Sequence, residues 1–95
     1  MKYWFHDIGD VEQGNIIEVT LDKAANVRVM DSDNYESFRN RRSYTAIIYY
    51  ITSSPFKIKL PRSAHWYVVV DPEDQPGSVV SSVKVYRKST SEKPV

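Results

Sequence analysis

The chain has 95 residues, a length that fits one domain with a single thin core. It carries 13 Lys and Arg against 12 Asp and Glu, and this balance gives no strong general attraction to nucleic acid or to an anionic membrane. Cysteine is absent, which excludes disulfides, thiolate metal sites and thiol nucleophiles. No apolar run is long enough to span a membrane, and the first residues lack the apolar core of a signal peptide. We therefore expect a cytoplasmic domain.

The first third of the chain reads as short strands separated by turns. Residues 2–5, "KYWF", suit a first strand, and Gln13-Gly14-Asn15 suits a turn. Apolar residues then alternate with polar ones in residues 17–21 and 27–29. Alternation of this kind predicts strands with one buried face and one wet face.

The stretch "DSDN", residues 31–34, raises the question of a calcium loop. Counted from Asp31, such a loop needs glycine at the sixth position and a bidentate glutamate at the twelfth, where this chain has Glu36 and Arg42. The stretch instead has the form of a capping box, in which Asp33 caps a helix and Glu36 reaches back to it. We predict one short helix over about residues 33–40.

The predicted helix determines where its aromatic and charged residues lie. Tyr35 and Phe38 are three apart, so both can face the sheet. The acidic residues lie at the positive end of the helix dipole, and Arg39, Arg41 and Arg42 lie at or beyond the negative end.

Two later runs are apolar at even and odd positions alike, so both faces of each predicted strand are apolar. They are "TAIIYYI" (residues 45–51) and "WYVVVD" (residues 66–71). We interpret both as strands that are covered on two sides or paired at the centre of a sheet. Between them, residues 56–60 alternate cleanly, with Pro55 and Pro61 placed just outside, where a missing N–H costs least.

The last part of the chain completes the predicted fold. Residues 71–78, "DPEDQPGS", read as a loop, and residues 83–85 continue the alternation. We predict an all-β antiparallel sandwich of about six to eight short strands with the one helix. Residues 1–88 form this single domain, and residues 89–95 form a flexible polar tail.

Three sets of residues could carry function. The segment "RNRRSY" offers Arg39, Arg41, Arg42 and Tyr44, which could neutralise phosphates and stack on a base of single-stranded nucleic acid. Steep weakening of binding by salt would identify that role. The chain has two histidines, and a site built from His65 and Asp71 would make a small hydrolase, although no nucleophile motif accompanies it.

The third set is the excess of aromatic residues. Most aromatics in β-proteins fill cores or make cross-strand pairs. Any that share one exposed face would suit stacking on a sugar or docking of a partner protein. The tyrosines in question are Tyr3, Tyr44, Tyr49, Tyr50 and Tyr67.

Three segments together resemble a known family. They are "ANVRVMDSDNYESFR", the proline-bracketed "PFKIKLP" and "HWYVVVD", and in order and spacing they resemble the bacterial family called domain of unknown function 1883. The likeness extends over roughly residues 10–88 and is carried by Asn26, Val27, Met30, Asp31, Asn34, Tyr35, Pro61, Trp66, Val68 and Asp71. It implies a compact all-β sandwich that occurs alone or as an accessory module, in some proteins beside Toll/interleukin-receptor-type signalling domains. It implies no activity, so no catalytic residue is carried over.

We therefore expect a non-enzymatic module that binds a protein or a small ligand such as a sugar, without a metal or other cofactor. Single-stranded nucleic acid is the less favoured partner, and the hydrolase comes last. The expected docking surface is the edge around Tyr35, the loop from Arg39 to Tyr44, and the "DPEDQPG" loop. Structural roles as caps, turn formers and a core aromatic are expected for Asp31, Asp33, Asn34, Glu36, Trp66 and Asp71.

Overall fold

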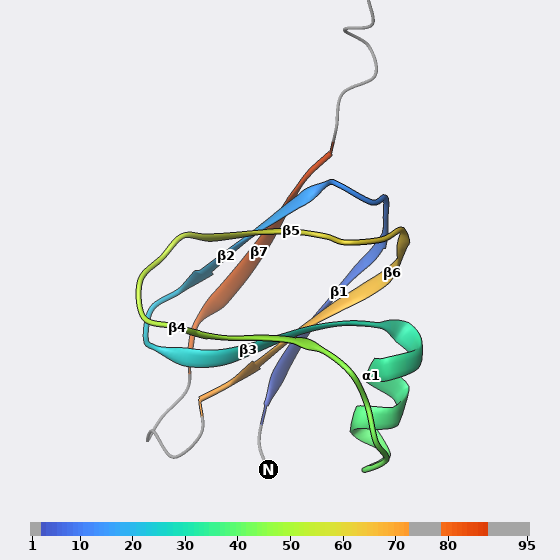
Figure 1. Cartoon of the computed structure of the whole chain (residues 1–95). Coiled ribbons are helices and arrows are strands. Elements are labelled where there is room, and N and C mark those ends of the chain that lie inside the picture. The colour runs from blue at the N-terminus through green and yellow to red at the C-terminus, as the bar shows by residue number, and fades with distance from the viewer. Residues whose placement is uncertain (1–2, 73–78, 88–95) are drawn as a thin grey trace, which may run out of the picture.

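The protein is a sandwich of two antiparallel sheets with one helix on its outside, as seen in a computed structural model that describes residues 3–72 and 79–87 (Figure 1). The predicted fold class is confirmed. The elements in chain order are β1 (Trp4–Val11), β2 (Ile16–Leu21), β3 (Ala25–Asp31), α1 (Ser32–Arg39), β4 (Ile47–Ile51), β5 (Phe56–Lys59), β6 (Ala64–Asp71) and β7 (Ser81–Tyr86).

The strand order mixes segments that are distant in sequence. The four-stranded sheet has the order β1-β6-β3-β4, and the three-stranded sheet has the order β5-β2-β7. Every paired strand runs antiparallel to its neighbour. A bulge between Asp7 and Gly9 interrupts the pairing of β1 with β6, and Gly9 supplies the positive φ of 76° at that point.

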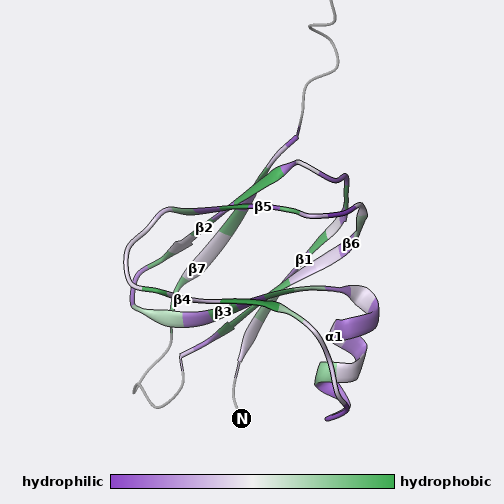
Figure 2. Cartoon of the chain, viewed as in Figure 1, coloured by the Kyte–Doolittle hydropathy of each residue, from purple (hydrophilic) through white to green (hydrophobic). Residues whose placement is uncertain are grey.

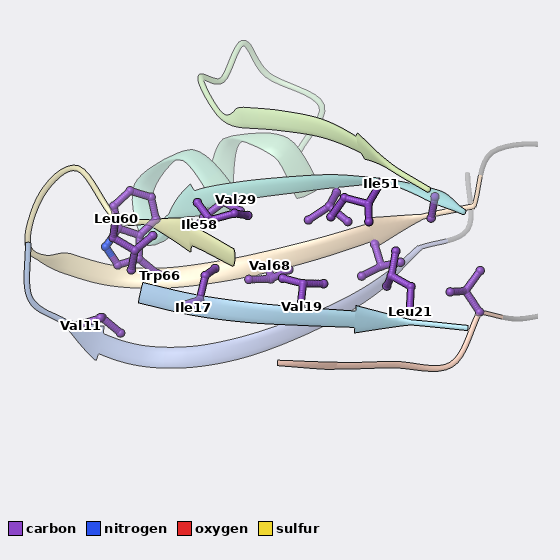
Figure 3. Packing of buried hydrophobic residues seen from close by; sticks show 14 residues of the cluster. Val11, Ile17, Val19, Leu21, Val29, Ile51, Ile58, Leu60, Trp66 and Val68 are labelled. Atoms are coloured by element: carbon purple, nitrogen blue, oxygen red, sulfur yellow. The ribbon is translucent and has the colours of Figure 1, made fainter. Parts of the chain in front are cut away.

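The main core fills the space between the sheets (Figure 3). The inward residues of the alternating strands predicted from the sequence meet there, because successive side chains of a strand point to opposite faces. Trp66 is almost fully buried at one end of this core, as expected of the core aromatic. The other large, fully buried members of this core are Val11, Ile17, Val19, Val27, Val29, Leu60, Val68 and Val70.

A second, smaller core lies on the outer face of the four-stranded sheet, under α1. Met30, Tyr35 and Val69 are buried there, with Tyr67 and Phe38 packed beside them. The rings of Tyr35 and Tyr67 stack at 4.1 Å between centroids. Both aromatic residues of the helix therefore face the sheet, as their spacing predicts.

The two runs that are apolar at even and odd positions alike take different positions in the four-stranded sheet. β6 lies between β1 and β3, with Val68 and Val70 in the main core and Val69 under the helix, so its interpretation as a covered strand is confirmed. The same interpretation is wrong for β4, which is an edge strand. Ile48 and Tyr50 of β4 are 55% and 58% exposed.

The predicted turns and the predicted positions of the prolines are confirmed where the structure describes them. Residues 13–15 form a turn in which the Asn15 backbone N–H donates to the Glu12 carbonyl. Pro55 and Pro61 lie outside β5. Most of the predicted loop at residues 71–78 and the predicted tail at residues 89–95 fall outside the described residues.

Candidate functional site

The N-terminus of α1 is capped by Asp31, the last residue of β3. Its carboxylate accepts a hydrogen bond from the backbone N–H of Asn34 at 2.9 Å and another from the Asn34 side chain at 2.9 Å. The predicted cap, Asp33, lies instead in the first turn, and Glu36 accepts a bond from Asn40, so the predicted capping box is wrong. The helix accordingly begins one residue earlier than predicted.

The environment of Asp31 favours its charged form. Desolvation acts to raise the pKa of this carboxyl, but the hydrogen bonds from Asn34 and Arg62 outweigh it, so the pKa lies below its usual value. Arg62 forms an ion pair with Asp31 and also lies over the ring of Trp66, 5.1 Å from the centroid. The Trp66 indole N–H donates to the Arg62 carbonyl at 3.1 Å. Asp31 and Trp66 thus belong to one structural cluster.

Asn34 joins the helix to the segment that leads into β4. Its side-chain oxygen accepts a hydrogen bond from the Thr45 backbone N–H at 2.8 Å. Since Asn34 is itself held by Asp31, the entry into β4 is fixed relative to β3 and α1.

Asp71 has a structural role on the outer face of the four-stranded sheet. It is buried and forms an ion pair with Arg28 at 3.0 Å. The Arg28 guanidinium also lies 5.9 Å from the centroid of the Phe38 ring. This pair ties β6 to β3 beside the helix.

The expected hydrolase site is not assembled, because Asp71 and His65 lie at opposite ends of β6. His65 Nε2 is 2.6 Å from Asp7, and His65 Nδ1 is 3.4 Å from Asp10. Desolvation acts to raise the pKa of Asp7, but the hydrogen bonds from His65 and the Gly9 backbone lower it below its usual value overall. Both imidazole nitrogens face carboxylates, so neither is presented to a substrate as a free base.

A pocket of about 550 Å³ lies beside His65. Its lining by the described residues includes Asp10, Glu12, Ser63 and Arg87 but no Tyr, Trp or Phe. This part of the lining therefore provides no aromatic platform for a stacked sugar.

Tyr35 does not belong to an accessible docking surface. It is only 6% exposed, and burial in the second core raises its pKa to about 12. The expectation that it lines a docking edge is corrected by the packing of α1 on the sheet, which uses the tyrosine as a core residue.

The basic segment lies at the C-terminal end of α1 and just after it. Arg39, Arg41 and Arg42 are all exposed, and Arg39 makes a loose ion pair with Glu36 at 3.7 Å. Tyr44 packs edge-on against Phe38 at 5.1 Å and keeps part of its ring accessible. The structure therefore keeps these four residues on one accessible segment.

Exposed apolar residues gather in β4 and just before it. Within the described residues, four of the seven large exposed apolar residues fall in the short stretch from Tyr44 to Tyr50 (Figure 2 shows the hydrophobic part of β4). Ile48 and Tyr50 pair with Arg28 and Asn26 of β3, so they share the outer face of the four-stranded sheet. Tyr49 points to the other face and packs against Phe56 of β5 at 4.9 Å.

The second side of β4 is open. β4 pairs with β3, and no other strand of the described residues pairs with it. An edge strand presents a row of unpaired main-chain donors and acceptors, which is a template for another strand. Residues 45–52 contain no charged residue, no proline and no glycine that would discourage such pairing.

The other edge of the same sheet is protected. β1 has the bulge at Asp7 and Gly9, and it carries charge at Asp7 and Asp10. The His6 side chain also hydrogen-bonds Ser81 of β7 at 2.8 Å, so β7 lies beside this edge.

The edges of the three-stranded sheet are protected in other ways. β5 has four residues, two of which are Lys57 and Lys59, and it is bracketed by prolines. β7 carries Lys84 and lies beside β1. Of the four sheet edges, β4 alone lacks any of these devices within the described residues.

Sequence reasoning missed Ile48 as a functional candidate. The signal was present, because the run "TAIIYYI" is apolar at both parities and yet follows a basic, exposed segment. Burial inside the domain explains such a pattern in β6 but not in β4.

Among residues 3–72 and 79–87, no group of three His, Cys, Asp or Glu side chains is placed to hold a metal ion. No helix in the same residues is long and apolar enough to cross a membrane.

Comparison with known proteins identifies the family. No curated protein and no solved structure matches the chain. The family described as "Domain of unknown function (DUF1883)" matches residues 1–89. The chain therefore belongs to this family.

Proposed function

We propose that the protein is a non-enzymatic interaction module that binds an extended segment of a protein by strand addition at the open edge of β4. The observation that carries the proposal is the exposed, uncharged and unprotected edge of β4 in a molecule whose other sheet edges are protected. The absence of cysteine supports a cytoplasmic setting for this function.

Strand addition uses what β4 exposes. A segment laid along β4 would pair with its outward main-chain groups, and each such hydrogen bond contributes about 0.5–1.5 kcal/mol net. Its side chains would cover Ile48 and Tyr50, at about 25 cal/mol per Å² of apolar area. Backbone pairing supplies affinity, and the two exposed side chains supply preference for apolar partners.

Protein docking is favoured over sugar binding because of shape. Three of the four exposed tyrosines in the described residues, Tyr44, Tyr49 and Tyr50, lie in or just before the edge strand β4, and no Tyr, Trp or Phe of those residues lines the pocket beside His65. A row of main-chain donors and acceptors selects a polypeptide strand.

A charge placed on β4 tests the proposal. Peptides are selected from a library of random extended sequences on the wild-type protein, and their binding is followed by amide chemical shifts. We expect the largest shifts in β4, and we expect Ile48→Lys to weaken binding at least tenfold, since lysine on an edge strand opposes pairing.

The matched control is Val80→Lys. Val80 is 68% exposed and precedes β7 in the three-stranded sheet, so the variant adds the same charge away from β4. Peptides that bind both variants equally, or that shift residues outside β4, would count against the proposal.

Single-stranded nucleic acid is the second candidate, supported by the shared accessibility of Arg39, Arg41, Arg42 and Tyr44. For this function we expect a fluorescent oligothymidylate to bind with an affinity that falls steeply with salt, and Arg41→Glu to abolish binding. Binding that is insensitive to salt, or to Arg41→Glu, would exclude this candidate.

A further inference from the structure

We infer that the strand received at the β4 edge is β4 of a second copy of the chain, in antiparallel orientation. This inference rests on the proposed function and names the partner of the same edge. Two copies of the four-stranded sheet would then form one continuous sheet across a two-fold axis.

The composition of β4 suits pairing with itself. The strand has no charge, so two copies meet without burying charged side chains or placing like charges together. A two-fold axis at Tyr49, the middle residue of β4, is the register that pairs all five strand residues. It places Ile48 opposite Tyr50 of the second copy on the outer face, which makes two aliphatic–aromatic cross-strand pairs.

The basic segment favours the antiparallel orientation. Arg39, Arg41 and Arg42 precede β4 at its N-terminal end. Antiparallel pairing places the two sets of arginines at opposite ends of the joined strands. Parallel pairing would bring the two sets together, and like charges at close range repel.

The assembly would also be closed. After pairing, the outermost strands of the joined sheet are the two β1 strands, each with its bulge and its acidic residues. Neither invites a further strand. Pairing therefore stops at two copies and does not continue into a fibre.

The small size of the contact between the two β4 strands determines the affinity that we expect for the dimer. Five residues on each side, with Ile48 and Tyr50 as the main apolar contributors, make a small interface of the kind found in weak and transient complexes. We therefore expect a dimer that depends on concentration.

Sedimentation of the wild type between about 1 μM and about 1 mM tests the inference. We expect the mass to rise from monomer to dimer. Ile48→Lys is expected to remain monomeric over the same range, and Val80→Lys is expected to dimerise as the wild type does.

Single cysteines test the register, because the chain has none of its own. Tyr49→Cys is expected to form a disulfide-linked dimer on mild oxidation, since residues directly opposite have Cβ atoms about 4.5–5.5 Å apart. Tyr50→Cys lies opposite Ile48 of the second copy in this register, so it is expected to cross-link less.

The outcomes separate this inference from the proposed function. A wild type that stays monomeric throughout, or a dimer that survives Ile48→Lys, would overturn self-pairing through β4. A monomer whose β4 amides still shift with a selected peptide would overturn self-pairing alone and leave strand addition supported.

Discussion

A small set of polar side chains decides how the helix and β4 are placed. Asp31 ends β3, caps α1 and pairs with Arg62, which lies over the ring of Trp66. Asn34 carries the same connection onward to Thr45, just before β4. These contacts fix the entry into the proposed docking strand.

The cap can be tested against its neighbour. We expect Asp31→Ala to lower the free energy of unfolding by about 1 kcal/mol or more, because it removes the cap and the partner of Arg62. Asp33→Ala is expected to cost under about 0.5 kcal/mol, since Asp33 is exposed and only helps the helix dipole. Urea unfolding of both variants gives the comparison, and a larger loss for Asp33→Ala would refute this assignment of the cap.

The prediction of Asp33 as the cap was wrong because the sequence around it fits a cap at Asp31 equally well. Asp31 precedes Asn34 by three residues and Asp33 precedes Glu36 by three, and local chemistry favours both. The choice is made by the length of β3, which stays paired with β6 as far as Asp31, opposite Trp66. That pairing connects residues 35 positions apart in the chain, which a local pattern does not report.

At the scale of elements, the alternating strands were predictable and the sheet positions were not. β2, β3, β5 and β7 follow period-two patterns because each has one face in the core. β4 and β6 share one apolar pattern, yet one is an edge and the other is central. An apolar strand indicates that its side chains are covered by apolar surroundings. A partner outside the domain covers them as well as the domain's own core does.

The candidate site was predicted only in part for the same reason. The arginine segment is local, and its exposure agrees with its composition. The two carboxylates that face His65, those of Asp7 and Asp10, come from a strand more than fifty residues away, and Asp7 lies beyond a bulge that shifts the register. Neither the bulge nor the strand order can be read from the sequence around His65.

In the part of the chain that the structure describes, one sheet edge, that of β4, lacks the protection that the other sheet edges have. Three edges carry a bulge, lysines, prolines or a neighbouring strand, and the β4 edge carries exposed isoleucine and tyrosine. Pairing two copies through β4 would cover the edge that alone, among the described residues, lacks a protecting feature. This gives a physical reason for the apolar surface that the fold itself leaves uncovered.

Hydrogen exchange of the β4 amides at low and high protein concentration tests this account most directly. Amides at alternate residues of Ile47–Ile51 point away from β3, and we predict that they exchange quickly in dilute protein and become protected as concentration rises. The amides of β1 are predicted to exchange at the same rate at both concentrations. Rates in β4 that do not change with concentration, or protection that grows at β1 instead, would contradict pairing through this edge.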